Sequence, residues 1–288
     1  MKKFLAMACL STAIGGTAMA DWPQWRGPNR TDVSQESGLL KKWPEGGPQQ
    51  IWLNKDAGLG YAGFSIVGDT LYTMGARDNT EMLIAITAKE GKQKWAVPMS
   101  GQLKNKWGDG PRGTPTVDGD HVYALSGTGS LVCAKTADGT VVWKKSMSDL
   151  GGKTPGWGYT ESVLVDGDKV VCTPGGKQGA IVAFNKTTGD VLWQSKDFTE
   201  GAQYASIIVA EHNGKRQHIQ LTMSKLVGLD AENGKVLWTS DFPGKTAVIP
   251  TPIFKDGHVY ITAGYGVGCK LVKIGPDNKP ADVYRTSP

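Results

Sequence analysis

The sequence predicts an all-β protein of the β-propeller class, in which short antiparallel sheets repeat around an axis. Two motifs that recur in phase support this fold. A tryptophan stands four residues after a glycine four times, at spacings of 48, 50 and 45 residues, and such a period is typical of radial or stacked repeats. The segment Val117–Tyr123 recurs in similar form at the same period. The four pairs are Gly91 and Trp95, Gly139 and Trp143, Gly189 and Trp193, and Gly234 and Trp238.

Each repeat unit shows the alternation of a β-strand. Within residues 119–125, Val122 and Ala124 point one way while His121 and Tyr123 point the other. Asp-Gly and other glycine-containing turns separate such runs, as in hairpins, and no long stretch after residue 20 keeps a helical period. Three to four strands in about 45 residues are typical of a propeller blade. We count five units, over residues 57–100, 107–148, 156–197, 201–243 and 247–288.

The glycines and tryptophans of the repeat have a structural role in this interpretation. Each glycine supplies a positive φ in the turn before the last strand of its unit. Each tryptophan then buries a large ring between neighbouring blades. We therefore expect Trp95, Trp143, Trp193 and Trp238 to hold blades together rather than to bind a ligand.

The strand pair Ala-x-x-Gly-x-x-x-Trp resembles the pyrroloquinoline-quinone-type (PQQ-like) propeller repeat. That repeat occurs in quinoprotein alcohol dehydrogenases and in the propeller lipoprotein of the outer-membrane β-barrel assembly machine. Residues 22–29 (Trp-Pro-Gln-Trp-Arg-Gly-Pro-Asn) and 155–159 (Pro-Gly-Trp-Gly-Tyr) are similar to segments of exported bacterial PQQ-like propellers. The resemblance covers nearly all of the chain after residue 20. It implies a fold rather than a function, because propellers host unrelated activities.

The resemblance also implies a ring that closes with about eight blades. Residues 48–53, within an N-terminal segment 21–56, are interpreted as a closing strand whose partner blade is absent. The fifth unit reaches Pro288 without a Gly-to-Trp strand. We therefore expect an incomplete part of a ring, an open arc whose exposed faces and edges favour self-association.

The first twenty residues are interpreted as a secretory signal peptide. Lys2 and Lys3 precede a mostly apolar run, and Ala18-Met19-Ala20 forms a cleavage site, so Asp21 would begin the mature protein. The apolar run is too short to span a bilayer. We expect a periplasmic or secreted protein with no transmembrane segment after cleavage.

Charge and cysteines narrow the function further. The formal net charge is +5, and removal of the two lysines in residues 1–20 leaves +3 (5 − 2), too little and too scattered for a nucleic-acid surface. The remaining cysteines, Cys133, Cys172 and Cys269, are odd in number and irregularly spaced. They indicate buried free thiols rather than a disulfide framework.

Aligning the five units gives a register for the start of each innermost strand. Small residues stand at that start, which fits the crowding of strands near a propeller axis. Two positions earlier the residues differ in size and charge from unit to unit, which is where a repeat protein can place specificity. Arg112 could hold a carboxylate or phosphate, and Tyr61 and Tyr204 could offer aromatic faces. The small residues are Gly63, Thr114, Ser162, Ser206 and Thr251, and the variable ones are Tyr61, Arg112, Thr160, Tyr204 and Ile249.

A second candidate segment, residues 151–161, is rich in glycine and aromatic residues and precedes an innermost strand. Functional loops on a rigid scaffold have this composition, and the alternative is a packing role. We expect Trp157, Tyr159 and Glu161 to lie with Arg112 on one rim, around the mouth of the axial funnel. Arg112 would contact an anion, and the two aromatic rings would stack on the ligand.

No residue pattern identifies a catalytic or metal site. The four histidines share no metal-ligand spacing, and Ser206 near His212 does not make a triad. The favoured function is an exported, non-catalytic propeller without a cofactor that binds a protein, peptide or glycan in the cell envelope. The alternative is a quinoprotein oxidoreductase acting on alcohols or sugars with PQQ and calcium. The sequence lacks the adjacent cysteine pair of such enzymes and offers no match to their calcium or catalytic residues.

Overall fold

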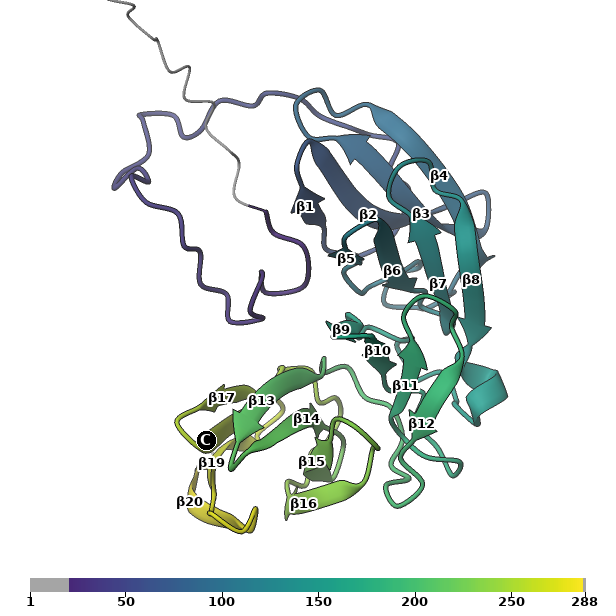
Figure 1. Cartoon of the computed structure of the whole chain (residues 1–288). Helices are drawn as coiled ribbons and strands as arrows, with labels where there is room; N and C mark the ends of the chain where they lie inside the picture. Colours follow the sequence, from purple (N-terminus) through teal and green to yellow (C-terminus); the bar gives the residue numbers. More distant parts are fainter. Residues whose placement is uncertain (1–20, 287–288) are drawn as a thin grey trace, which may run out of the picture.

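The computed structural model describes residues 21–286, so the expected signal peptide lies outside the described residues. The described chain forms five four-stranded antiparallel sheets, each with its strands in sequence order, and one 3₁₀ turn, η1 (Met147–Leu150). The fold is a β-propeller, as predicted. Figure 1 shows the sheets following one another along an arc, while residues 21–56 cross the space between the first and the fifth sheet.

Each sheet is built from one repeat unit. Sheet one holds β1 (Ser65–Val67), β2 (Thr70–Arg77), β3 (Thr80–Thr87) and β4 (Gln93–Gly101). Sheet two holds β5 (Thr116–Asp118), β6 (His121–Leu125), β7 (Ser130–Lys135) and β8 (Val141–Ser146). Sheet three holds β9 (Leu164–Asp166), β10 (Lys169–Cys172), β11 (Val182–Asn185) and β12 (Val191–Gln194). Sheet four holds β13 (Ile208–His212), β14 (Lys215–Leu221), β15 (Lys225–Asp230) and β16 (Val236–Asp241). Sheet five holds β17 (Ile253–Lys255), β18 (His258–Ala263), β19 (Gly268–Ile274) and β20 (Pro280–Thr286).

The repeated glycine and tryptophan make one contact between sheets that recurs along the arc. Gly139 has a φ of 77°, and a Cβ there would lie 2.8 Å from the ring of Trp95, the tryptophan of the preceding sheet. The Trp95 indole N–H donates to the carbonyl of Thr136, three residues before that glycine, at 3.0 Å. Trp143 and Trp193 make the same bond to Lys186 and Ala231 in the next sheets. Each ring therefore packs on the following sheet's turn, where a side chain on the glycine would collide with it.

Residues 48–53 do not form the expected closing strand. No strand is assigned between residues 21 and 64. Trp52 nevertheless occupies the place of a preceding sheet's tryptophan, because its indole N–H donates to Ala88 at 2.8 Å and its ring lies over Gly91. Sheet one thus receives the tryptophan contact without a neighbouring strand ladder.

The fifth unit, in turn, is more complete than its sequence indicates. β20 pairs with β19 and supplies the fourth strand that the missing Gly-to-Trp motif led us not to expect. Tyr284 pairs with Leu271 next to a bulge, the register that Trp238 takes against Gly228 in sheet four. With no following glycine turn, the Trp238 indole donates to Gln217 of its own sheet at 2.7 Å.

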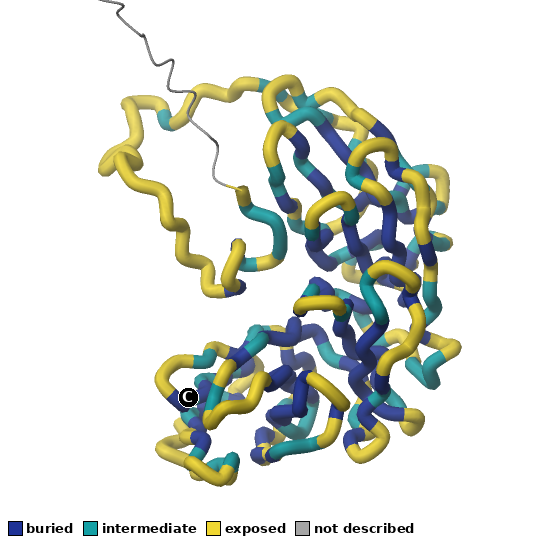
Figure 2. The backbone as a smooth tube through the Cα atoms, viewed as in Figure 1, coloured by how far each residue is buried: buried dark blue, intermediate teal, exposed yellow. Residues whose placement is uncertain are grey.

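The first twelve described residues, which we call the hub segment (residues 21–32), bind all five repeat units in the first strand or in the residues just before it. Trp22 exchanges two backbone hydrogen bonds with Ile66, the carbonyl of Pro23 accepts from Val117, and Trp25 donates to Thr251. The Arg30 guanidinium, only 5% exposed, donates to the carbonyls of Ser162, Val163 and Ile207. The hub segment therefore ties the inner strands together, whereas residues 33–53 beyond it are mostly exposed (Figure 2).

Candidate functional site

Small side chains at the start of the innermost strands bring those strands close together. The backbone N–H of Thr114 donates to the Ser162 hydroxyl at 2.9 Å, and that of Ser162 donates to the Ser206 hydroxyl at 3.0 Å. At Gly63, an added Cβ would lie 2.3 Å from Thr114 Oγ1. These close approaches place the residues two positions earlier around one opening.

That opening is a cavity of about 360 Å³, which we call the funnel-mouth cavity. All five variable positions of the register line it, although they are spread over almost two hundred residues of sequence. Trp157 and Tyr265 complete the aromatic part of the wall. The lining residues are Tyr61, Arg112, Trp157, Thr160, Tyr204, Ala247, Ile249 and Tyr265.

Arg112 supplies the cationic group of the cavity. Its guanidinium carbon lies 5.1 Å from the centre of the Tyr61 ring, and one Nη donates to the Gly108 carbonyl. Its Nε is buried and has no hydrogen-bond partner. A buried donor without an acceptor costs about 1–3 kcal/mol, so this orientation of the guanidinium carries a cost.

Another part of the cavity wall is an aromatic pair. The rings of Trp157 and Tyr204 meet edge to face with centroids 5.6 Å apart. Tyr204 is held in place by backbone bonds, since its N–H donates to Val248 and its carbonyl accepts from the Thr160 hydroxyl. Tyr61 is 61% exposed and Tyr204 only 8%, so the cavity is lined by one exposed and one buried tyrosine ring.

Tyr159 and Glu161, expected on the same rim, lie behind the cavity instead. The Tyr159 ring is 2% exposed, packs over Gly129 and donates its hydroxyl to Pro174. Its ring therefore cannot offer the stacking surface that we expected of it. Residues alternate sides along an extended segment, which explains why the neighbouring Thr160 faces the cavity and Tyr159 does not.

Glu161 lies close to the axis as a buried carboxyl. It is 3% exposed and accepts hydrogen bonds from the N–H and hydroxyl of Thr173. Burial raises its pKa to about 7, although those bonds and the charge of Arg30 act in the opposite direction. Burial also lowers the pKa of Arg30 to about 10. Arg30 thus binds the carbonyl of Ser162, which lies two residues after the cavity-lining Thr160 in the sequence.

Sequence reasoning missed Arg30, Tyr265 and His218. Arg30 directly follows the segment of residues 22–29 that carries the resemblance, so that segment was the available signal. Tyr265 lies outside the register, in a Gly-Tyr-Gly loop between β18 and β19. Its φ of 60° is unusual for a bulky residue.

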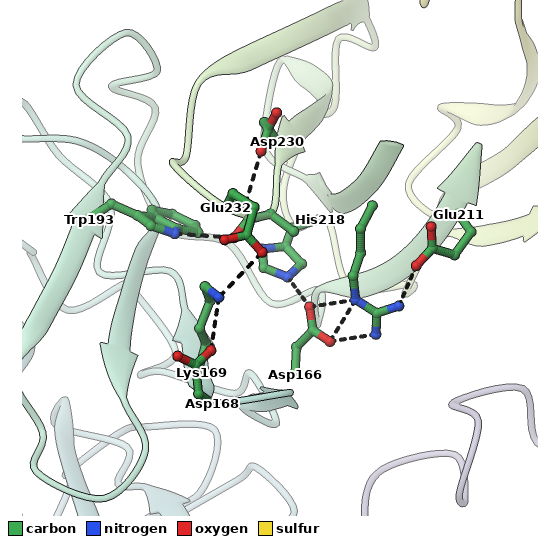
Figure 3. Close-up of polar contacts among 10 residues, drawn as sticks. Asp166, Asp168, Lys169, Trp193, Glu211, His218, Asp230 and Glu232 are labelled. Atoms are coloured by element: carbon green, nitrogen blue, oxygen red, sulfur yellow. Dashed lines mark hydrogen bonds and ion pairs between the residues drawn. The ribbon is translucent and has the colours of Figure 1, made fainter. Parts of the chain in front are cut away.

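His218 belongs to a polar cluster between sheets three and four (Figure 3), none of whose labelled residues lines the funnel-mouth cavity. Its Nε2 lies 2.7 Å from Asp166, and Arg216 donates three further bonds to the same carboxylate. Burial by itself would raise the pKa of Asp166, but the hydrogen bonds and charges of His218 and Arg216 hold it well below its usual range. His218 is 0% exposed, so this cluster is an inter-sheet tie rather than an acid–base site open to substrate.

Three further findings concern metal ligands, membrane-spanning helices and cysteines. Residues 21–286 contain no group of three or more His, Cys, Asp or Glu side chains placed to hold a metal ion. Within the same described range, no helix has the length and apolar character needed to cross a bilayer. Cys133 and Cys172 are buried free thiols, and Cys269 is a partly exposed one.

Comparison with known proteins places the fold. Tetrathionate hydrolase from Acidianus ambivalens is 32% identical over a segment that covers 32% of this chain and 18% of that protein. A europium-containing methanol dehydrogenase superposes with a TM-score of 0.54 at 13% identity, covering 82% of this chain and 56% of that chain. The quinohemoprotein alcohol dehydrogenase from Comamonas testosteroni gives 0.54 at 13% identity, covering 88% and 46%.

These likenesses show the propeller fold and no more, because the sequence identities of the two solved structures are low. The chain spans about half the length of these two dehydrogenases and under a fifth of the hydrolase. The family model described as outer membrane protein assembly factor BamB matches residues 79–276. That match covers well over half of the chain and includes strands of all five sheets, so the protein belongs to this BamB family of PQQ-like repeat propellers.

Proposed function

We propose that this protein is an exported, non-catalytic binding module of the cell envelope that captures a protein or peptide through the funnel-mouth cavity. The observation that carries the proposal is the convergence of five equivalent positions, Tyr61, Arg112, Thr160, Tyr204 and Ile249, around one opening. Their surroundings repeat from sheet to sheet, while their side chains differ. A repeating scaffold that carries different side chains at equivalent positions around one opening is suited to recognition.

The cavity chemistry favours an anionic group beside an apolar or aromatic one. Arg112 lines the cavity, and its planar guanidinium suits a carboxylate. Trp157, Tyr204 and Ile249 supply the apolar and aromatic wall. A peptide with a carboxylate near an aromatic or aliphatic side chain presents both groups, and an acidic glycan is the second ligand class that would do so.

The quinoprotein alternative would require calcium with PQQ, and the cavity does not fit that ion. Calcium binds six to eight oxygen ligands, with carboxylates prominent among them. The wall of the funnel-mouth cavity holds no carboxylate, and Glu161 behind it is committed to Thr173. We therefore assign no quinone chemistry to these residues.

The proposal is tested by calorimetric titration of short peptides that end in an aromatic or aliphatic residue with a free carboxylate. The same peptides with an amidated end, and a uronic-acid oligosaccharide, complete the panel. We expect the free carboxylate to bind and Arg112→Ala to weaken binding at least tenfold, with the melting temperature nearly unchanged. Arg112→Lys should recover part of the affinity, because it keeps the charge but loses the planar fork.

Lys144→Ala serves as the matched control, since Lys144 is an exposed cation of β8 outside the cavity. If only the oligosaccharide binds, the ligand of the cavity is a glycan and not a peptide. Equal affinities in Arg112→Ala and the unaltered protein would refute a site at Arg112. Dye-coupled oxidation of an alcohol or sugar after addition of PQQ and calcium would refute the non-catalytic assignment.

A further inference from the structure

Two loops between sheets supply the cation and the indole of the funnel-mouth cavity. The first loop, residues 102–112, lies between sheets one and two and ends on Arg112. The second loop, residues 151–161, lies between sheets two and three and carries Trp157. Because the two loops belong to different repeat units, the position of Arg112 relative to Trp157 depends on what holds one loop against the other.

Asn105 joins these two loops. Its side-chain amide donates to the carbonyl of Gly156 in the second loop at 2.8 Å. Its side-chain oxygen accepts from the backbone N–H of Trp107 at 3.0 Å, and its main-chain carbonyl accepts from that of Gly108 at 2.9 Å. A single residue therefore shapes the turn in the first loop and ties that turn to the second loop.

Each end of this tie lies next to a residue of the cavity wall. Gly156 directly precedes Trp157 in the chain. Gly108, whose N–H bonds to Asn105, accepts a hydrogen bond from the Arg112 guanidinium through its own carbonyl. The bond from Asn105 to Gly156 therefore connects the turn that holds Arg112 with the segment that carries Trp157.

The base of the first loop is held separately, by a buried carboxylate and an apolar contact. Glu81 is 0% exposed and accepts from the N–H of Leu103 at 2.9 Å and from that of Gly127 at 2.7 Å. The Leu103 side chain packs against Gly158, where an added Cβ would lie 2.3 Å from its Cδ2. These buried contacts do not involve Asn105, so its loss should leave the fold intact and act on the less buried turns beside the cavity.

We propose that Asn105 is a positioning residue of the funnel-mouth cavity, which fixes Arg112 relative to Trp157 so that one ligand meets both. The inference rests on the proposed function, because it concerns the same cavity. A site that is ordered in advance avoids the cost of ordering its side chains when the ligand binds. The favoured ligand then carries its carboxylate and its aromatic or aliphatic group at a nearly fixed separation, as the last residue of a peptide does.

Asn105→Ser tests the proposal without adding a charge. The serine hydroxyl can still accept from the N–H two residues on, as it does in turns of this kind, but it is one bond shorter than the amide and no longer reaches Gly156. We expect the free-carboxylate peptides to bind about two- to tenfold more weakly, the range for one hydrogen bond, with the melting temperature nearly unchanged. Asn54→Ser is the matched control, since Asn54 makes the same pair of bonds outside the cavity, accepting from Asp56 and donating to Gly91.

A double-mutant cycle separates positioning from a purely structural role. In the unaltered chain, the losses of affinity caused by Arg112→Ala and Trp157→Ala should be non-additive, because one ligand contacts both residues. In the Asn105→Ser background, the same two losses should approach additivity. Unchanged affinity in Asn105→Ser, or the same coupling in both backgrounds, overturns the proposal. A melting temperature well below that of Asn54→Ser also overturns it, in favour of a structural role.

A measurement without ligand distinguishes this inference from the proposed function. The Gly158 amide, which bonds to Pro155 within the second loop, should exchange with solvent severalfold faster in Asn105→Ser, whereas the Tyr159 amide, which bonds to Gly127, should not change. If no peptide binds the unaltered protein, the proposed function fails, and the exchange of Gly158 alone decides whether Asn105 fixes the second loop. Unchanged exchange of Gly158 overturns the inference even where the peptides bind.

Discussion

Single tryptophans carry the contact between neighbouring sheets. Trp143 is 8% exposed, its indole N–H donates to Lys186 at 3.0 Å, and its ring lies on Gly189. Two of its neighbours are aromatic, since Tyr123 and Phe184 have ring centroids 5.9 and 6.1 Å away. A smaller side chain at this position would leave a cavity between the strand and the glycine turn.

We predict that Trp143→Ala lowers the free energy of unfolding by about 3–5 kcal/mol, the range for deleting a buried large aromatic side chain. Trp43→Ala, at a tryptophan that is 64% exposed, should change it by less than about 1 kcal/mol. Chemical denaturation of both variants makes the comparison. Equal small effects would show that Trp143 is dispensable for packing.

Glu161 is the residue whose charge should make stability depend on pH. Its folded-state pKa, about 7, lies above the ordinary value of 4.5. The folded state therefore holds the proton more tightly, and this contribution to stability is fully present below pH 4.5 and is lost as the pH rises through 7. The largest loss is about 3 kcal/mol, from 1.36 kcal/mol for each unit of pKa.

We predict that the loss of unfolding free energy between pH 5 and pH 8 is smaller by up to that amount in Glu161→Gln. The variant keeps a carbonyl oxygen that can accept from Thr173 but has no charge to bury. Denaturation at a series of pH values measures the difference, and Glu36→Gln, at an exposed carboxylate, is the control. Parallel pH profiles for Glu161→Gln and the unaltered chain would contradict the assignment.

At the scale of elements, the sequence pattern predicts the strands that follow the repeat. It does not predict the elements in which part of the repeat motif is missing. The alternation of residues 119–125 and the glycine turns indicated the sheets, because each unit folds from its own pattern. β20 lacks the tryptophan motif, so the sequence did not predict this strand. The structure shows it through its pairing with β19, in which Tyr284 stands where the other sheets have tryptophan. Residues 48–53 kept the tryptophan but not the strand, since Trp52 alone makes the contact with Gly91.

The candidate site shows the same division between local and long-range information. The register placed Tyr61, Arg112 and Tyr204 at equivalent positions, and equivalent positions of a propeller share one rim. It could not show that Tyr159 turns inward, because one residue of phase decides which side a side chain takes. Arg30 could not be found from the repeat either, since its partners in sheets three and four are more than a hundred residues away.

The whole molecule is held by nearest-neighbour contacts and by one element that reaches every sheet. In repeat proteins each unit contacts its neighbours, so stability is approximately a sum of local contributions. The hub segment departs from this arrangement, because its hydrogen bonds reach Ile66 in sheet one, Val117 in sheet two and Thr251 before sheet five. Disrupting the hub segment should therefore destabilise sheets that do not contact the altered residue.

We predict that Arg30→Met lowers the free energy of unfolding by at least about 2 kcal/mol, because three carbonyls lose their donor within a buried site. The amides of Ile66 and Val117, which bond to the hub and not to Arg30, should exchange with solvent together and faster. The Asn185 amide, bonded to Asp190 within sheet three, should exchange more slowly than both. Arg285→Met is the control at an exposed arginine. Unchanged exchange at Ile66 and Val117 would mean that the hub does not act as one unit.

The reach of the hub segment also sets an order of events in time. Trp25 and Thr251 are separated by 226 residues, so this bond cannot form until the chain leading into sheet five has been made and brought to the axis. Contacts between residues far apart in sequence are slow to form, because loop closure must come first. Residues 21–32, the earliest described part of the chain to be synthesised, can pair with Ile66 early, but they complete their contacts only after the chain leading into sheet five has reached the axis.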